Sequence, residues 1–189
     1  MTDVTDGDPP VADSSAVLDS ILERIRGLPD KDKQGLAALV TEKTKHRLWI
    51  PTAGPQYDAV KCQADLLLYG GSGGSGKTDL DLGLAFTEHQ KSLMIRKTYT
   101  DLGGLTDRAI EINGTRDGFN GSIPPKLNTV NGRRIDFGGI SNLGDEEHWQ
   151  GRPHDLLCID EVVQCHESQV RFLMGWVRTT TPGQRARTV

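Results

Sequence analysis

The sequence predicts an α/β fold in which helices flank a parallel β-sheet. Three short apolar runs have the length and composition of buried strands, at residues 66–69, 92–96 and 156–159. Stretches in which apolar residues recur at helical spacing lie between and after them, at residues 80–86, 101–112 and 170–177. Strands that alternate with helices are typical of a parallel sheet whose faces are covered by helices.

The 189 residues divide into three segments of different composition. Residues 1–14 are polar, acidic and proline-bearing, which predicts a disordered tail. Residues 15–48 carry two stretches of helical periodicity, one ending near Gly27 and one capped by Asp30, and predict a helical appendage. Residues 49–189 hold the predicted strands, and their number is sufficient for one domain with a substantial core.

A hairpin is predicted within the main domain. Asn131 and Gly132 separate residues 127–130 from residues 133–137, and Asn-Gly is the strongest short-range signal for a tight turn between antiparallel strands. The helix expected over residues 101–112 contains two consecutive glycines, which weaken its helical pattern.

Composition excludes several classes of protein. The longest apolar runs fall far short of the roughly 18 residues that span a bilayer. The net charge of −4 comes from four aspartates in residues 1–14, so the remainder is neutral and shows no overall bias toward nucleic acid. Four arginines near the end, with no acid after Glu167, fit either a phosphate-facing patch or a solvated helix face: Arg171, Arg178, Arg185 and Arg187.

The cysteines indicate a reducing compartment. Cys62, Cys158 and Cys165 are odd in number and show no metal-binding spacing, which is typical of reduced thiols in a cytoplasm. The N-terminus also lacks the basic and apolar regions of a secretory signal. A cytoplasmic location is therefore expected.

A glycine-rich loop connects the first predicted strand to the helix that follows it. It fits G-x-x-x-x-G-K-[ST] without departure, as Gly71, Ser72, Gly73, Gly74, Ser75, Gly76, Lys77 and Thr78. Such a loop wraps backbone N–H groups around a β-phosphate, and the dipole of the helix that follows adds positive potential. Lys77 is expected to contact the β- and γ-phosphates, and Thr78 to bind Mg²⁺. The predicted ligands are ATP and Mg²⁺.

Two consecutive acids end the strand at residues 156–159. Asp160 is expected to hold Mg²⁺ at the carboxyl edge of the sheet, where ligands of α/β folds bind. Glu161 is expected to act as the general base that activates water for attack on the γ-phosphate. Without the glycine-rich loop, two acids at this point could simply favour the start of the next helix. With it, they favour a hydrolase over a kinase of small molecules.

These motifs and their flanks resemble the ATPase domain of the large terminase subunit of tailed bacteriophages. The resemblance covers residues 49–189, and its most specific part is Arg178 to Arg185, which other P-loop proteins do not need. It also includes five shorter segments, at residues 49–56, 69–80, 83–85, 93–102 and 150–161. The resemblance implies an ATPase motor that packages double-stranded viral DNA into a procapsid. It further implies a portal protein, a small terminase subunit and a homo-oligomeric ring as partners of the full-length protein.

The resemblance also implies roles for individual residues. Gln56 would read the adenine edge, unless it is simply a glutamine in a turn. Trp49 or Tyr57 could stack on the base, although an aromatic here is more often part of a core. Arg96 or Arg152 could polarise the γ-phosphate; the alternative is that each pairs with a nearby carboxylate.

The sequence departs from that family at its end. Large terminases continue with a coupling motif and a nuclease domain, whereas this chain stops at Val189, so no nuclease activity is expected of it. In P-loop ATPases with such an acidic pair, a strand that follows the pair in sequence lies between the phosphate-loop strand and the strand before the pair. The resemblance therefore implies a strand between residues 66–69 and 156–159, and here it could begin only near residues 185–189. We therefore expect a largely unfilled gap in the sheet and marginal stability. A non-hydrolysing ATP-binding remnant and an unrelated helicase-like P-loop ATPase are the alternative functions.

Overall fold

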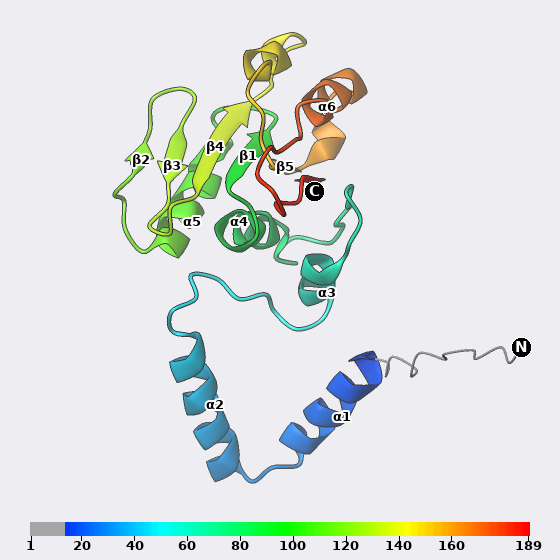
Figure 1. Cartoon of the computed structure of the whole chain (residues 1–189), viewed down its shortest axis with the longest axis vertical. Coiled ribbons are helices and arrows are strands. Elements are labelled where there is room, and N and C mark those ends of the chain that lie inside the picture. The colour runs from blue at the N-terminus through cyan, green and yellow to red at the C-terminus, as the bar shows by residue number, and fades with distance from the viewer. Residues whose placement is uncertain (1–13) are drawn as a thin grey trace, which may run out of the picture. The chain divides into compact units, whose positions relative to one another are not determined.

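A computed structural model describes residues 14–189 of the chain (Figure 1). The tail expected over residues 1–14 lies outside the described residues, apart from Ser14. The chain divides into two compact units, Met1–His46 and Arg47–Val189. None of the helices in the described part is long and apolar enough to cross a membrane.

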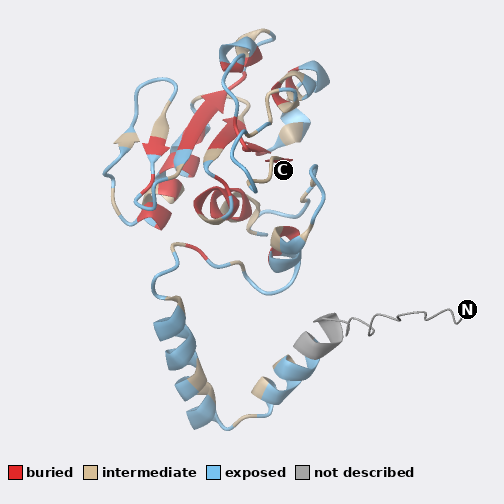
Figure 2. Ribbon diagram, viewed as in Figure 1, coloured by how far each residue is buried: buried red, intermediate tan, exposed pale blue. Residues whose placement is uncertain are grey.

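The first unit contains two helices, α1 (Ser14–Arg26) and α2 (Asp30–Thr44). Gly27 follows the last turn of α1 and donates its N–H to the Glu23 carbonyl. Pro29 occupies the N-cap of α2, so the expectation that Asp30 caps this helix is wrong. Asp30 is instead the first residue of the helix, where its negative charge interacts favourably with the helix dipole. The side chains of residues 19–46 are exposed or half-buried (Figure 2).

The second unit is built on a six-stranded sheet with the order β2-β3-β4-β1-β5-β6. The strands are β1 (Lys91–Arg96), β2 (Phe119–Asn120), β3 (Lys126–Asn128), β4 (Arg134–Gly139), β5 (Leu156–Ile159) and β6 (Arg187–Thr188). Neighbouring strands in the series β4-β1-β5-β6 pair in parallel, while β2 and β3 pair antiparallel with their neighbours. The predicted α/β fold is confirmed, but the sheet is mixed, because the hairpin around Gly132 adds antiparallel strands at one edge.

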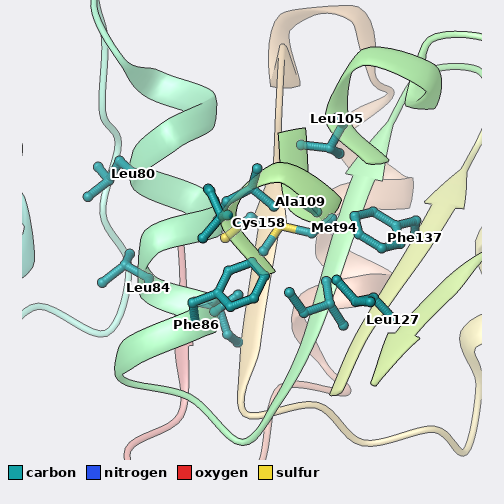
Figure 3. Packing of buried hydrophobic residues seen from close by; sticks show 14 of the residues in the cluster. Leu80, Leu84, Phe86, Met94, Leu105, Ala109, Leu127, Phe137 and Cys158 are labelled. Atoms are coloured by element: carbon teal, nitrogen blue, oxygen red, sulfur yellow. The ribbon is translucent and has the colours of Figure 1, made fainter. Parts of the chain in front are cut away.

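Helices cover both faces of this sheet. They are α3 (Pro55–Lys61), α4 (Lys77–Thr87), α5 (Leu102–Asn113) and α6 (Glu167–Met174), with short 3-10 helices η1 (Asp145–Trp149) and η2 (Val162–Gln164). Side chains that alternate along the strands enter two separate cores. Met94 and Cys158 pack with α4 and α5 in one core (Figure 3), whereas Leu93 and Ile159 pack with α6 in the other.

The apolar run at residues 66–69 is not a buried strand, contrary to the prediction. It forms a single bridge, from Leu66 to Thr188, and Leu66 and Leu68 are 59% and 82% exposed. Leu67 and Tyr69, on alternate positions, pack against the core. The run remains extended, but it pairs only with a very short strand, so few hydrogen bonds define a ladder.

The end of the chain lies in the gap that was expected to stay open. β6 pairs with β5 in parallel, and Thr188 exchanges hydrogen bonds with Asp65 and Leu67 on its other side. Val189 continues this pairing by accepting a hydrogen bond from the Ile159 N–H at 3.0 Å. The added strand therefore lies beside β5 and next to residues 65–67, the place predicted for it. The gap is filled along the full length of β5, which removes the reason for expecting unpaired backbone there.

Two of the four C-terminal arginines are used inside the protein. Arg185 Nη1 donates to the Cys62 carbonyl at 3.0 Å, and Arg187 Nη2 donates to the Ala59 carbonyl at 2.9 Å. Arg187 is 2% exposed. These two side chains therefore fasten the end of the chain to α3 and the segment after it, and form neither a phosphate-facing patch nor a solvated face.

Candidate nucleotide-binding site

The glycine-rich loop precedes α4, as the sequence predicts. Gly74 and Gly76 have φ angles of 79° and 77°, in the left-handed region where a side chain would be strained. Gly76 is the N-cap of α4, and Lys77 is the first residue of that helix. The loop therefore turns directly into a helix N-terminus, the arrangement that lets backbone N–H groups and the helix dipole face a phosphate.

Lys77 extends its ammonium group back across the loop. Its Nζ donates to the carbonyl oxygens of Gly71 at 2.9 Å and Ser72 at 3.1 Å. These acceptors are neutral, and an ammonium binds a charged phosphate oxygen more strongly than a carbonyl. A phosphate group in the loop would therefore attract the Lys77 side chain.

Thr78 and Asp160 meet at the carboxyl edge of the sheet. Thr78 Oγ1 donates to Asp160 Oδ2 at 2.9 Å, which joins the first turn of α4 to the residue that follows β5. Asp160 is 8% exposed, and its N–H donates to the Ile95 carbonyl at 3.0 Å. A hydroxyl and a carboxylate at this distance fit the preference of Mg²⁺ for oxygen ligands. In residues 14–189, no group of three His, Cys, Asp or Glu side chains could hold a metal by itself, so the remaining ligands would have to come from phosphate and water.

Arg96 pairs with Asp160. Its Nε and Nη2 donate to Asp160 Oδ2 at 3.1 and 2.6 Å, and its Nη1 donates to the Asp101 carbonyl at 2.7 Å. Of the two readings given by the sequence, the structure shows the carboxylate pairing. The action of Arg96 on a γ-phosphate stays a prediction.

Arg152 lies apart from the glycine-rich loop. Its guanidinium is 5.8 Å from the centre of the Trp149 ring, and it lines a separate cavity of about 290 Å³ with Tyr99 and Asp145. Arg96 is therefore the arginine that the structure places beside Asp160.

Glu161 has an unusual backbone conformation. Its φ of 60° is the only positive value of a non-glycine residue in the described part of the chain. Such a conformation costs about 1–3 kcal/mol and persists where the surrounding structure requires it. The side chain is exposed, and its Oε2 accepts a hydrogen bond from Gln164 Nε2 at 2.5 Å. The geometry is compatible with a base that faces solvent, and its role in catalysis remains a prediction.

Asp81 is a site residue that the sequence reasoning missed. It lines a cavity of about 640 Å³ together with Lys77, Asp160, Glu161 and a wall of apolar side chains. Burial, and after it the charge of Asp160, raise the pKa of Asp81 from 3.8 to about 7, against smaller opposing effects of Cys158 and Arg96. Lys77 and Asp81 are four residues apart on one helix, so their spacing could have placed both on one face.

Gln56 is buried against the glycine-rich loop. Its Oε1 accepts from the Thr52 N–H at 2.6 Å and from Thr52 Oγ1 at 3.0 Å, while its Nε2 donates to the Gly76 carbonyl at 3.0 Å. The side chain therefore links the turn before α3 to the N-cap of α4. The structure shows this structural use, and recognition of adenine by Gln56 stays a prediction.

A second cavity, of about 580 Å³, lies beside Gln56. Gly74, Ser75, Gly76, Asp79 and Arg108 line it together with residues 47–50 and Thr52. Arg108 donates from Nε and Nη2 to the two carboxylate oxygens of Asp79 at 2.9 and 3.0 Å, a pairing that the sequence reasoning did not identify.

The aromatic residues proposed to stack on a base differ in their surroundings. Trp49 is 8% exposed and packs on α4, where a Cβ at Gly83 would lie 2.3 Å from its ring. Tyr57 is 39% exposed, with Lys61 Nζ at 5.7 Å from its ring centre. Trp49 therefore serves as part of the core, the alternative that the sequence left open.

Comparisons with known proteins find similarity to solved structures but no match in sequence. The sequence matches no family model and no curated protein. The structure is similar to that of the large terminase from the thermophilic bacteriophage D6E in complex with ADP, with a TM-score of 0.46 and 21% identity. The match covers 75% of this chain and 35% of the terminase chain. This similarity is too low to indicate a function, so the function is inferred from the geometry of the chain's own site.

Proposed function

We propose that residues 47–189 form a Mg²⁺-dependent ATP-binding and ATP-hydrolysing domain. The observation that carries this proposal is the hydrogen bond from Thr78 Oγ1 to Asp160 Oδ2, which joins the phosphate-binding loop to the acid at the end of β5. Each motif alone is common, but this contact brings the predicted metal ligands to one point. A cavity of about 640 Å³ adjoins them and is lined by Lys77 and Glu161.

The residues of the chain have separate roles in this proposal. The loop and Lys77 bind the phosphates, and the loop N–H groups with the α4 dipole neutralise their charge. Thr78 and Asp160 would hold Mg²⁺, which when bound neutralises charge that develops between the β- and γ-phosphates. Glu161 orients and deprotonates the attacking water from the solvent side.

We further propose that this domain is the motor of a phage large terminase. The support is the resemblance of the sequence over residues 49–189, above all in the segment from Arg178 to Arg185. In the structure, this segment leads into β6 and fastens it to residues 62–64 through Arg185, so it helps to build the sheet edge beside the loop. Double-stranded viral DNA, a portal protein and a small terminase subunit would be partners of the assembled motor.

Phosphate release from ATP by the purified chain tests the enzymatic proposal. Lys77→Ala should lose both nucleotide binding and turnover, whereas Glu161→Gln should keep binding and lose turnover by about 100-fold or more, because only the base is removed. Lys126→Ala, a lysine on β3 away from the loop, is the matched control and should behave as the wild type. Binding without any turnover in the wild type would favour a non-hydrolysing ATP-binding protein instead.

The gene beyond codon 189 tests the assignment to a packaging motor. An in-frame coupling motif followed by a carboxylate-rich nuclease domain is the expected result. Helicase motifs in the same reading frame would contradict a terminase and leave the ATPase proposal intact.

A further inference from the structure

The pairing of Arg96 with Asp160 is built into the register of the sheet. β1 and β5 are parallel, with Ile95 opposite Ile159, so the next residue of each strand lies at the same edge. The Asp160 N–H donates to the Ile95 carbonyl at 3.0 Å, which fixes the start of the loop after β5. The strand register therefore places Arg96 and Asp160 side by side, so that their side chains can pair.

Three hydrogen bonds end on a single oxygen of Asp160. Thr78 Oγ1 approaches Oδ2 at 2.9 Å, Arg96 Nε at 3.1 Å and Arg96 Nη2 at 2.6 Å. A carboxylate oxygen has about two lone-pair directions, so Oδ2 is fully used as an acceptor. The third nitrogen of the guanidinium donates to the Asp101 carbonyl at 2.7 Å, which holds Arg96 from its other side.

The positive charge of Arg96 opposes the binding of a metal ion to Asp160. The Arg96 and Asp160 side chains are 21% and 8% exposed, so solvent screens their attraction only in part. Arg96 places a full positive charge on the carboxylate that is predicted to hold Mg²⁺. A second cation that approaches Asp160 must therefore overcome repulsion from Arg96 and compete for the same oxygen.

We propose that Arg96 is a positioning residue that competes with Mg²⁺ for Asp160, so that the metal binds with the nucleotide and not alone. This inference rests on the proposed nucleotide site. The negative charge of a bound nucleotide stabilises a cation beside Thr78. The nucleotide phosphates also offer the Arg96 guanidinium an anionic partner other than Asp160. Arg96 then acts through Asp160, as a barrier to metal binding in the nucleotide-free protein.

Another arginine–aspartate pair in the same sheet provides a matched control. Arg134 Nη2 donates to Asp136 Oδ1 at 2.8 Å on β4, and Arg134 is not a residue of the glycine-rich loop or the two cavities beside it. Arg134→Gln removes a guanidinium from a buried aspartate, as Arg96→Gln does, but away from the proposed metal site.

Binding of Mn²⁺ to the nucleotide-free chain, followed by electron paramagnetic resonance, tests the competition. Arg96→Gln should bind Mn²⁺ about 10-fold or more tighter than the wild type, because the competing charge is removed. Arg96→Lys keeps that charge and should stay within about 3-fold of the wild type, as should Arg134→Gln. Adding Asp160→Asn to Arg96→Gln should abolish the gain. Equal Mn²⁺ affinity in Arg96→Gln and the wild type would overturn the proposal.

A measurement on the wild type covers the case in which Arg96→Gln does not fold. The Arg96 Nε–H resonance, identified by its loss in Arg96→Lys, should stay in place when Mg²⁺ is added alone and move when Mg²⁺ and ADP are added together. A shift with Mg²⁺ alone, or no shift while ADP binds, would contradict the competition. Failure of ADP to bind would instead refute the proposed nucleotide site, and the Mn²⁺ results would remain independent of it.

Discussion

Two buried aspartates, Asp136 on β4 and Asp81 on α4, have pKa values shifted in opposite directions. Asp136, on β4, accepts hydrogen bonds from Arg134 at 2.8 Å and, in the tautomer that carries Nε2–H, from His154 at 2.9 Å. Burial would raise the pKa of Asp136, but the His154 and Arg134 hydrogen bonds outweigh it, and the pKa is lowered. Asp81, beside the glycine-rich loop, has its pKa raised to about 7 by burial and by Asp160.

The two aspartates differ in the groups that surround them. Asp136 has cationic and hydrogen-bonding partners that stabilise its charge, as is usual for a buried carboxylate. Asp81 shares its surroundings with Asp160, whose negative charge disfavours ionisation of Asp81. Perturbed carboxyl groups of this kind cluster at functional sites, and Asp81 lies in the cavity that Lys77 and Glu161 line.

The largest expected effect follows from the raised pKa of Asp81. The folded chain holds a proton on Asp81 between pH 4 and 7 that the unfolded chain has lost, so stability falls as pH rises through this range and stays low above pH 7. Asp81→Asn removes the penalty and should stabilise the chain at pH 8 by on the order of 2–4 kcal/mol. The gain should shrink toward pH 4. Urea unfolding at the two pH values measures it, and an equal gain at both would contradict the raised pKa.

An intermediate effect of opposite sign is expected for Asp136→Asn. The variant keeps the size of the side chain but removes the charge that His154 and Arg134 stabilise, and should lower the free energy of unfolding by about 1–3 kcal/mol at pH 7. Urea unfolding measures the loss. A variant as stable as the wild type would show that the charge of Asp136 is no better compensated than that of Asp81, which would contradict the contrast between the two aspartates.

The smallest effect is expected for Arg134→Gln. The Arg134 side chain is 46% exposed, and His154 remains on Asp136 when Arg134 is removed. Exposed ion pairs contribute about 0–1 kcal/mol, so thermal unfolding should change by no more than a few degrees. A loss as large as that of Asp136→Asn would mean that Arg134, and not His154, is the partner on which Asp136 depends.

Contiguous patterns made the centre of the site predictable from sequence. Gly71 to Thr78 and the acid after β5 follow local rules, since a glycine-rich turn opens a helix and parallel strands end at one edge of the sheet. The position of β6 was expected from the strand order of P-loop ATPases, although the gap that it fills was expected to stay largely open. These features need no knowledge of which side chains meet across the fold.

Features that depend on distant neighbours could not be predicted in this way. The pairing of Arg96 with Asp160 depends on the register between β1 and β5, which an apolar run does not specify. The run at residues 66–69 looks like any buried strand, because sequence does not show that its partner β6 is two residues long. Gln56 has the same identity whether its amide bonds to a ligand or, as here, to Thr52 and Gly76.

Equilibrium binding of a fluorescent ATP analogue, with and without Mg²⁺, tests the central claim most directly. Because Thr78 and Asp160 meet at the glycine-rich loop, the wild type should bind the nucleotide saturably and at least about 10-fold more tightly with Mg²⁺. Asp160→Asn should keep the metal-free affinity and lose most of this gain. Saturable binding that is unaffected by Mg²⁺ and by Asp160→Asn, or no saturable binding at all, would contradict the claim that these residues form a Mg²⁺–nucleotide site.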